Sequence, residues 1–136
     1  MDIRTKEAVR YLGYGRHAID ERTLELIQDS FQELDQVADA RFVYRIFEII
    51  EENENELTIG GIRIQSKNLC KNLKNCKHGI VFCATLGTSV DLLLKRYSVS
   101  DMSKTVVLQA CAAAFLEEYC DRMQKQIEDG LENGLY

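Results

Sequence analysis

The apolar residues in the first part of the chain recur every three or four positions, which is typical of amphipathic helices. This spacing predicts a short helix over residues 5–12 that ends at Gly13, followed by the loop GYGRH at 13–17. Asp20 can cap a second helix that runs to about Ala38. We expect this helix to pack one apolar face on a sheet, and the residues of that face are Leu24, Ile27, Phe31, Leu34 and Val37.

Strand-like alternation replaces the helical spacing in the next part of the chain. RFVYRIFEII at 41–50 alternates two sets of mainly aromatic and β-branched side chains, and ENENE at 52–56 is a charged turn. LTIGGIRI at 57–64 places Gly60 and Gly61 between two short runs, which is a good signal for a two-residue hairpin. The first half of the chain is therefore predicted to hold three antiparallel strands.

Two helices and one strand are predicted next. Ser66 can cap a short amphipathic helix, SKNLCKNLKN, that ends near Asn75. GIVFCATL at 79–86 is apolar for most of its length, which predicts a central strand covered on both faces. TSVDLLLKRY at 88–97 is then a helix. In the first of these helices the lysines lie outside, and the inward residues are Leu69, Cys70 and Leu73.

The longest predicted element is one helix over residues 101–129. Between residues 106 and 116 its only polar side chain is Gln109, so we expect this part to run through the centre of the structure. The helix is amphipathic after that part, and Gly130 and Gly134 end it. Small residues permit close approach of a neighbour, and larger ones then face inward: Ala110, Cys111, Ala112, Ala113 and Ala114, followed by Tyr119, Cys120, Met123 and Ile127.

Length, composition and charge limit the class of protein. The 136 residues are 46% hydrophobic and 29% charged, which predicts one globular domain over residues 1–136. The net charge is −5 and the 17 Lys and Arg are scattered, so a nucleic-acid partner is not expected. The start of the chain, MDIRTKEAVRYLG, lacks the apolar region of a signal peptide, and no run suits a membrane span. We therefore expect a cytoplasmic protein with no membrane partner.

Signals for catalysis or metal binding are weak. His17 and His78 have no nearby Ser, Cys and Asp pattern of an activated nucleophile, and both glycine-rich phosphate motifs are absent. The spacing of Cys70 and Cys76 differs from the close pairs of zinc sites. All the cysteines lie in apolar patterns, which favours core thiols without a disulfide, and they are Cys70, Cys76, Cys83, Cys111 and Cys120.

Polar residues gather in the segment ATLGT at 84–88, where a strand is predicted to meet a helix. In the simpler interpretation, Thr88 or Ser89 caps the helix and Gly87 turns the chain. In the functional interpretation, these hydroxyls, with Thr85 and the helix amides, face a ligand at the carboxyl end of the strand. The sequence favours the simpler interpretation.

Glu117 is the first charged residue after the apolar part of the long helix. Its neighbour Glu118 can pair with Arg122 four residues on, whereas Glu117 faces Cys120 and Asp121 and has no local partner. A carboxylate at the edge of a core is either solvated or reserved for a group that donates hydrogen bonds. The sequence leaves these two alternatives open.

Four segments together resemble the activation domain of cobalamin-dependent methionine synthase, and more closely the free-standing small proteins related to that domain. They are RFVYRIF at 41–47, SKNLCKNLKNC at 66–76, GIVFCATLGTSVD at 79–91 and DMSKTVVLQACAAAFLEEYCD at 101–121. The resemblance extends from about Arg10 to Tyr136. It implies an α+β fold, in which long helices flank a twisted, mainly antiparallel sheet.

The resemblance also implies a function in methionine biosynthesis. In the enzyme, this domain binds S-adenosylmethionine and docks on the cobalamin domain while the oxidised cobalt is reduced and remethylated, with an electron from a flavodoxin-like partner. Glu117 matches a family glutamate at the S-adenosylmethionine site, and Thr85, Gly87 and Thr88 match the strand-end loop. The implied partner is methionine synthase or another corrinoid protein, and cobalamin is expected only through that partner.

This sequence departs from the family at its end. The family continues into a segment of the form Arg-x-Ser-Pro-Gly-Tyr that supplies much of the S-adenosylmethionine contact, whereas this chain stops at ENGLY and has no proline. We therefore expect a C-terminally short domain with an incomplete ligand site, and not an independent enzyme. Two functions follow as expectations: an accessory protein for corrinoid reactivation, or a non-catalytic scaffold module. Both predict a homo-oligomer or a complementing chain, because a shortened sheet leaves an open edge.

Overall fold

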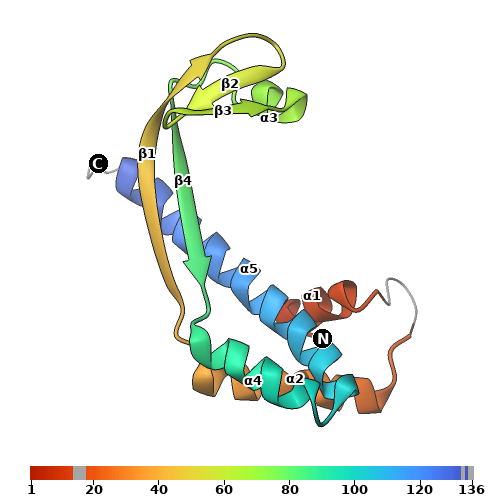
Figure 1. Ribbon diagram of the computed structural model, residues 1–136. Helices are drawn as coiled ribbons and strands as arrows, with labels where there is room; N and C mark the ends of the chain where they lie inside the picture. The colour runs from red at the N-terminus through yellow and green to blue at the C-terminus, as the bar shows by residue number, and fades with distance from the viewer. Residues whose placement is uncertain (14–17, 133, 135–136) are drawn as a thin grey trace. The chain divides into compact units, whose positions relative to one another are not determined.

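The computed structural model describes residues 1–13, 18–132 and 134. The chain forms two compact units, a helical unit of Met1–Arg41 with Ala84–Tyr136 and a sheet unit of Phe42–Cys83. Figure 1 shows the helices and the antiparallel strands of these units. The predicted α+β class is confirmed.

The helical unit is built around one long helix. It contains α1 (Ile3–Tyr11), α2 (Glu21–Val37), α4 (Thr88–Ser98) and α5 (Met102–Glu132), and the first three all contact α5. The apolar face of α2 therefore packs mainly on another helix, and the prediction that it packs on a sheet is wrong. The 3.6-residue period fixes which side of a helix is buried, but any apolar partner can cover that side.

The core of the helical unit lies along the first half of α5. Leu108 and Cys111 are fully buried there, and the Cys111 Sγ lies 3.8 Å from the carbonyl oxygen of Ile27 on α2. Several of the small residues on α5 are also buried, as their close-approach role requires, and these are Ala110, Ala112 and Ala114. The predicted central position of this segment is confirmed within the unit, although Val106 is exposed.

Side-chain caps fix where the helices begin. Asp20 Oδ1 accepts a hydrogen bond of 2.7 Å from the Thr23 amide, which confirms the predicted cap of α2. Asp101 accepts one of 3.0 Å from the Lys104 amide at the start of α5. The prediction that Gly130 ends α5 is wrong, because Gly130 lies inside the helix and is buried, whereas Gly134 has a φ of +68° just beyond the helix end at Glu132. Within the predicted loop 13–17 only Gly13 is described, and the rest lies outside the described residues.

The sheet unit holds most of a four-stranded sheet. The strands are β1 (Arg41–Glu51), β2 (Glu56–Ile59), β3 (Ile62–Gln65) and β4 (His78–Thr85), in the order β3-β2-β1-β4, and α3 (Lys67–Asn72) contacts β2. β1 pairs antiparallel with β2, and β2 with β3, so the three predicted strands are confirmed. Ser66 caps α3 as predicted, by accepting from the Leu69 amide.

The hairpin between β2 and β3 depends on its two glycines. Gly60 and Gly61 have φ values of +58° and +80°, which suit the two central positions of a type I′ turn. At Gly60 a Cβ atom would also lie 2.8 Å from the Phe47 ring on β1. Only glycine meets both the backbone and the packing requirement there.

The position of β4 corrects a prediction. An apolar run favours a central strand covered on both faces, but β4 is an edge strand with β1 as its one neighbour among the described strands. Val81 is 50% exposed and Phe82 37% exposed. An apolar run indicates a hydrophobic strand, but it does not indicate how many strands lie beside it. Figure 1 shows β1 and β4 running in opposite directions.

We predict that Leu108→Ala lowers the free energy of unfolding by about 2–5 kcal/mol, because it leaves a cavity in a core that the three other helices hold in place. Urea unfolding followed by helical circular dichroism measures this effect. Leu92→Ala is the matched control on α4, since Leu92 is 65% exposed, and its effect should stay within about 0.5 kcal/mol. Equal losses for the two variants would contradict the described core.

Candidate functional site

Glu117 lies on the side of α5 that faces α1. Tyr11 donates a hydrogen bond of 2.6 Å to its Oε2, and the Arg10 guanidinium lies 3.6 Å from the same oxygen. The sequence predicted no local partner, but the partners come from a helix 106 residues earlier in the chain. Oε1 of Glu117 accepts no hydrogen bond from the residues that the structure describes. One oxygen of this carboxylate is therefore open to a further donor.

The hydrogen bond to Glu117 also changes the tyrosine. It raises the pKa of the Tyr11 hydroxyl above its ordinary value, because a neutral phenol can donate to a carboxylate and a phenolate would be repelled by it. Tyr11 thus stays a donor throughout the physiological pH range. This contact keeps the Oε2 atom of Glu117 bound and holds the side chain against α1.

A cavity of about 410 Å³ lies beside Glu117, between α1 and α5. We call it the α1–α5 cavity. Its wall carries three guanidinium groups and four carboxylates, with apolar surface between them. The lining residues are Ile3, Arg4, Glu7 and Arg10 from α1, and Ala114, Glu117, Glu118, Asp121 and Arg122 from α5. Such a wall suits a ligand that carries charges of both signs.

Arg4, which lines this cavity from α1, contacts residues of both α2 and α5. It makes a two-pronged pair with Asp35 at 3.1 and 3.3 Å, and its Nε lies 3.2 Å from a Glu118 oxygen. Its guanidinium also lies 4.5 Å from the centre of the Phe31 ring and 5.0 Å from that of Phe115. Burial alone would lower the pKa of Arg4, but the hydrogen bonds and charge of Asp35, with the charge of Glu118, raise it.

The predicted pair of Glu118 with Arg122 is wrong. Glu118 is held by Arg4, and Arg122 instead lies over the Tyr119 ring at 5.8 Å. The sequence rule for helical pairs considers one helix at a time, and the half-buried Arg4 guanidinium on a neighbouring helix competes with it. Arg122 therefore lines the α1–α5 cavity without holding Glu118.

The predicted strand-end loop, residues 84–88, has a different construction. Gly87 has a φ of +91° and is the N-cap of α4, and its amide donates to Thr85 Oγ1 at 3.1 Å. A Cβ at Gly87 would lie 3.1 Å from the carbonyl oxygen of Asp39, so glycine is required there. The prediction that Thr88 or Ser89 caps the helix is wrong, because no side chain makes a cap hydrogen bond at this end.

The structure does not bring the two predicted groups of ligand residues into one cavity. Glu117 lines the α1–α5 cavity, whereas Thr85, Gly87 and Thr88 line neither that cavity nor the two other cavities described here. The Thr85 hydroxyl oxygen accepts a hydrogen bond from the Gly87 amide. Of the predicted ligand residues, Glu117 alone lies in a described cavity.

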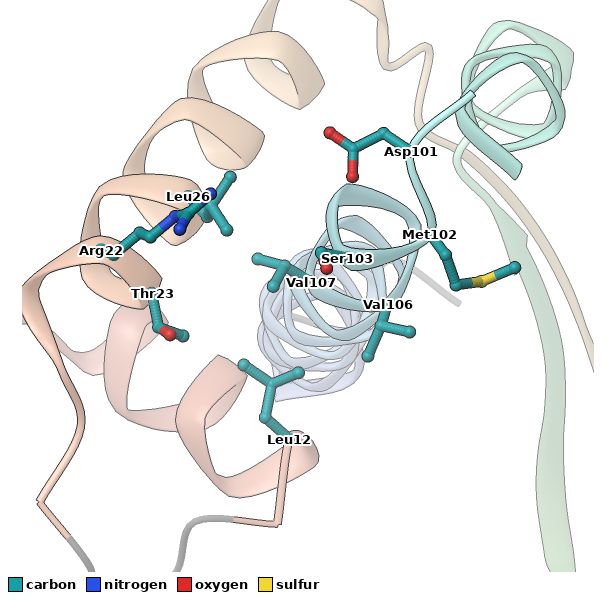
Figure 2. A pocket seen from close by; sticks show the side chains of 9 residues that line it. All are labelled: Leu12, Arg22, Thr23, Leu26, Asp101, Met102, Ser103, Val106 and Val107. Carbon is teal, nitrogen blue, oxygen red and sulfur yellow. The ribbon is translucent and has the colours of Figure 1, made fainter. Parts of the chain in front are cut away.

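Sequence reasoning missed a larger cavity of about 630 Å³ in the helical unit. Figure 2 shows it between the end of α1, the first turns of α2 and the start of α5. Leu26 and Val107 give it apolar surface, and Arg22 and Asp101 are its charged groups. Asp101 also caps α5 through its Oδ1 atom. Three distant segments build it, so no local motif could have indicated it.

A second missed feature is a polar cluster around Lys104, which is 6% exposed. Its Nζ lies 3.8 Å from Oε1 of Glu33, and the Tyr97 hydroxyl donates to the same oxygen at 2.8 Å. The hydrogen bond to Glu33 raises the pKa of Tyr97. These contacts join α2, α4 and α5, which indicates a structural role.

The sheet unit has a cavity of about 490 Å³ between α3 and the loop after β1. Leu57 is buried at its base, and glutamates and lysines form its rim. Glu51 is occupied there, because its Oε1 accepts from the Asn75 amide at 2.8 Å. The opposite charges of the rim largely compensate each other, so the cavity has no marked charge preference.

The five cysteines are free thiols, but they are not all core residues. Cys111 is buried, Cys70 and Cys120 are half-buried, and Cys76 and Cys83 are exposed, so the prediction of five core thiols is wrong for the last two. No group of three or more His, Cys, Asp or Glu side chains in the described part of the chain could hold a metal ion. In that same part, no helix has the length and hydropathy of a membrane span.

Comparisons with models of protein families, with curated proteins and with solved structures give no match.

Thiol labelling at pH 8 tests the placement of the cysteines. Burial raises the pKa of Cys111 to about 12, so almost none of it is thiolate at that pH, and the side chain is fully covered. We expect Cys76 and Cys83 to react first with a maleimide, and Cys111 to react only in denaturant. Peptide mass spectrometry after a short pulse assigns each site. Early labelling of Cys111 would contradict the described packing.

Proposed function

We propose that this chain is an accessory protein that binds S-adenosylmethionine and supports reductive remethylation of a corrinoid protein. The resemblance to methionine synthase activation domains motivates the proposal, and the α+β class agrees with the fold that this resemblance implies. The observation that carries it is the free Oε1 atom of Glu117 beside a cavity lined by charges of both signs. The proposal assigns binding and positioning to this chain, and the corrinoid to its partner.

The charges of the α1–α5 cavity complement those of the proposed ligand. S-adenosylmethionine carries a sulfonium and an ammonium cation together with one carboxylate. Glu117 and Asp121 can accept from the cationic groups, and Arg10 and Arg122 can donate to the carboxylate. The volume of about 410 Å³ lies within the usual range of roughly 300–1,000 Å³ for small-molecule sites. These residues fit the charged half of the ligand.

The bound ligand would supply the methyl group, and residues of this chain would hold it. Oε2 of Glu117 is occupied by Tyr11, so the carboxylate is oriented before any ligand arrives. A carboxylate held in place loses little conformational freedom on binding. Thr85, Gly87 and Thr88 remain predicted ligand residues, with no contribution to the α1–α5 cavity.

The second candidate function is a non-catalytic docking module, and the surface of the sheet unit favours it. Val43 is 72% exposed and Ile62 is 65% exposed, and both lie on strands whose apolar side chains would ordinarily be covered. β4 adds an open edge with exposed apolar side chains. Such a surface suits contact with another protein chain.

Calorimetric titration with S-adenosylmethionine tests the first function. We expect measurable binding by the unaltered chain and binding about 10-fold to 100-fold weaker for Glu117→Gln, because a hydrogen bond to a charged group contributes about 1.5–3 kcal/mol. Glu25→Gln is the matched control, since Glu25 is an exposed carboxylate on α2 outside the cavity, and its affinity should be unchanged.

S-adenosylhomocysteine makes this test more specific. It lacks the sulfonium charge, so carboxylates that recognise a cation should bind it more weakly than S-adenosylmethionine. If the chain binds the two ligands with equal affinity, its carboxylates do not recognise the sulfonium. If Glu117→Gln binds S-adenosylmethionine as tightly as the unaltered chain does, Glu117 does not contact the ligand. Absence of binding heat for every variant would remove the ligand function and leave the docking module.

A further inference from the structure

The outer edge of β4 is an open strand edge of eight residues. β1 is its one neighbour among the described strands, so alternate amide and carbonyl groups along the other edge have no strand partner. We infer that two copies of this chain pair antiparallel along β4, joining their sheets into one continuous sheet. The inference rests on the docking function proposed above and names the partner and the contact.

The main-chain groups along this edge of β4 suit pairing with another strand. Main-chain donors and acceptors in a row are best satisfied by an extended backbone, since side chains cannot match their regular spacing. β4 has eight residues, and Gly79–Thr85 contains no charge and no proline. Proteins commonly protect an open edge with a charged side chain, a proline or a short strand, and β4 has none of these.

The other edge of the sheet is protected. β3 has only four residues, and Arg63 extends from it with two thirds of its side chain exposed. A short strand that carries a charge is a poor template for pairing. Residues 41–48 of β1 also lack a partner on β2, but this stretch carries Arg41, Arg45 and Glu48, so among the described strands β4 has the uncharged open edge.

A second copy suits the open edge because β4 is self-complementary. In an antiparallel pair around a twofold axis, residues of the same neutral segment oppose each other, so no like charges meet. The exposed side chains of Val81 and Phe82 would gain apolar neighbours on the two faces of the joined sheet. The twofold pair uses the β4 edges of both copies, and the edges left over, β3 and residues 41–48 of β1, carry charged side chains, so assembly stops at two chains.

The favoured register places Phe82 opposite the Phe82 of the second copy. This register pairs seven residues of each strand. His78, at the start of β4, has a titratable side chain and stays outside the paired residues. In this register Val81 of one copy lies opposite Cys83 of the other, on the same face of the joined sheet. The arrangement can therefore be detected by a disulfide between these two positions.

Light scattering after size exclusion tests the pairing at about 100 µM protein, since dimer formation depends on concentration. We expect twice the 15.6 kDa mass of one chain, and a return to the single mass for Val81→Lys. Val43→Lys is the matched control, because Val43 is also an exposed valine but lies on β1, along the inner edge of β4. It should leave the dimer intact, and circular dichroism verifies that both variants fold.

Oxidative cross-linking tests the register in a Cys76→Ser background, which removes the other exposed thiol. Val81→Cys should form an intermolecular disulfide with Cys83, and Cys83→Ser should abolish it. A dimer lost on Val43→Lys but kept on Val81→Lys would overturn β4 pairing while leaving the docking function in place. A monomer at every concentration would overturn the pairing of two copies and leave docking on a different protein, and species larger than a dimer would overturn the twofold pair.

Discussion

The packing of three helices on the small side chains of α5 is the constraint on which the helical unit depends. Residues of low volume along this helix let α1 and α2 approach closely, and the larger Leu108 is fully buried in the same core. The position of α1 decides the candidate site, because α1 carries both Tyr11 and Arg10, which hold Glu117. A change that moved α1 would therefore act on the site without touching the carboxylate.

Arg4 is the main polar contribution to this packing. Its guanidinium lies near the Phe31 and Phe115 rings, hydrogen-bonds to Asp35 and forms an ion pair with Glu118. Taking a cation partly out of water costs free energy, and paired carboxylates with ring faces offset that cost. The same arrangement commits Glu118 to a structural contact, which leaves Glu117 and Asp121 as the carboxylates of α5 available to a ligand in the α1–α5 cavity.

The sequence predicted the features that depend on local chemistry. The cap at Asp20, the hairpin at Gly60-Gly61 and the long helix follow from short-range rules, and each is present. Features that depend on distant partners were predicted wrongly. The apolar run of β4 could not reveal an edge position, and the spacing around Glu117 could not reveal Tyr11, because neither strand order nor helix docking has a local pattern.

The two candidate functions use different parts of the molecule, so substitutions can test each function separately. The α1–α5 cavity belongs wholly to the helical unit, whereas Val81, Phe82 and Cys83 of β4 belong to the sheet unit. A substitution at Glu117 changes charge in a cavity that contains no strand residue, and a substitution at Val81 changes an edge that contributes nothing to that cavity. Ligand binding and chain pairing can therefore coexist in one protein, and loss of either need not impair the other.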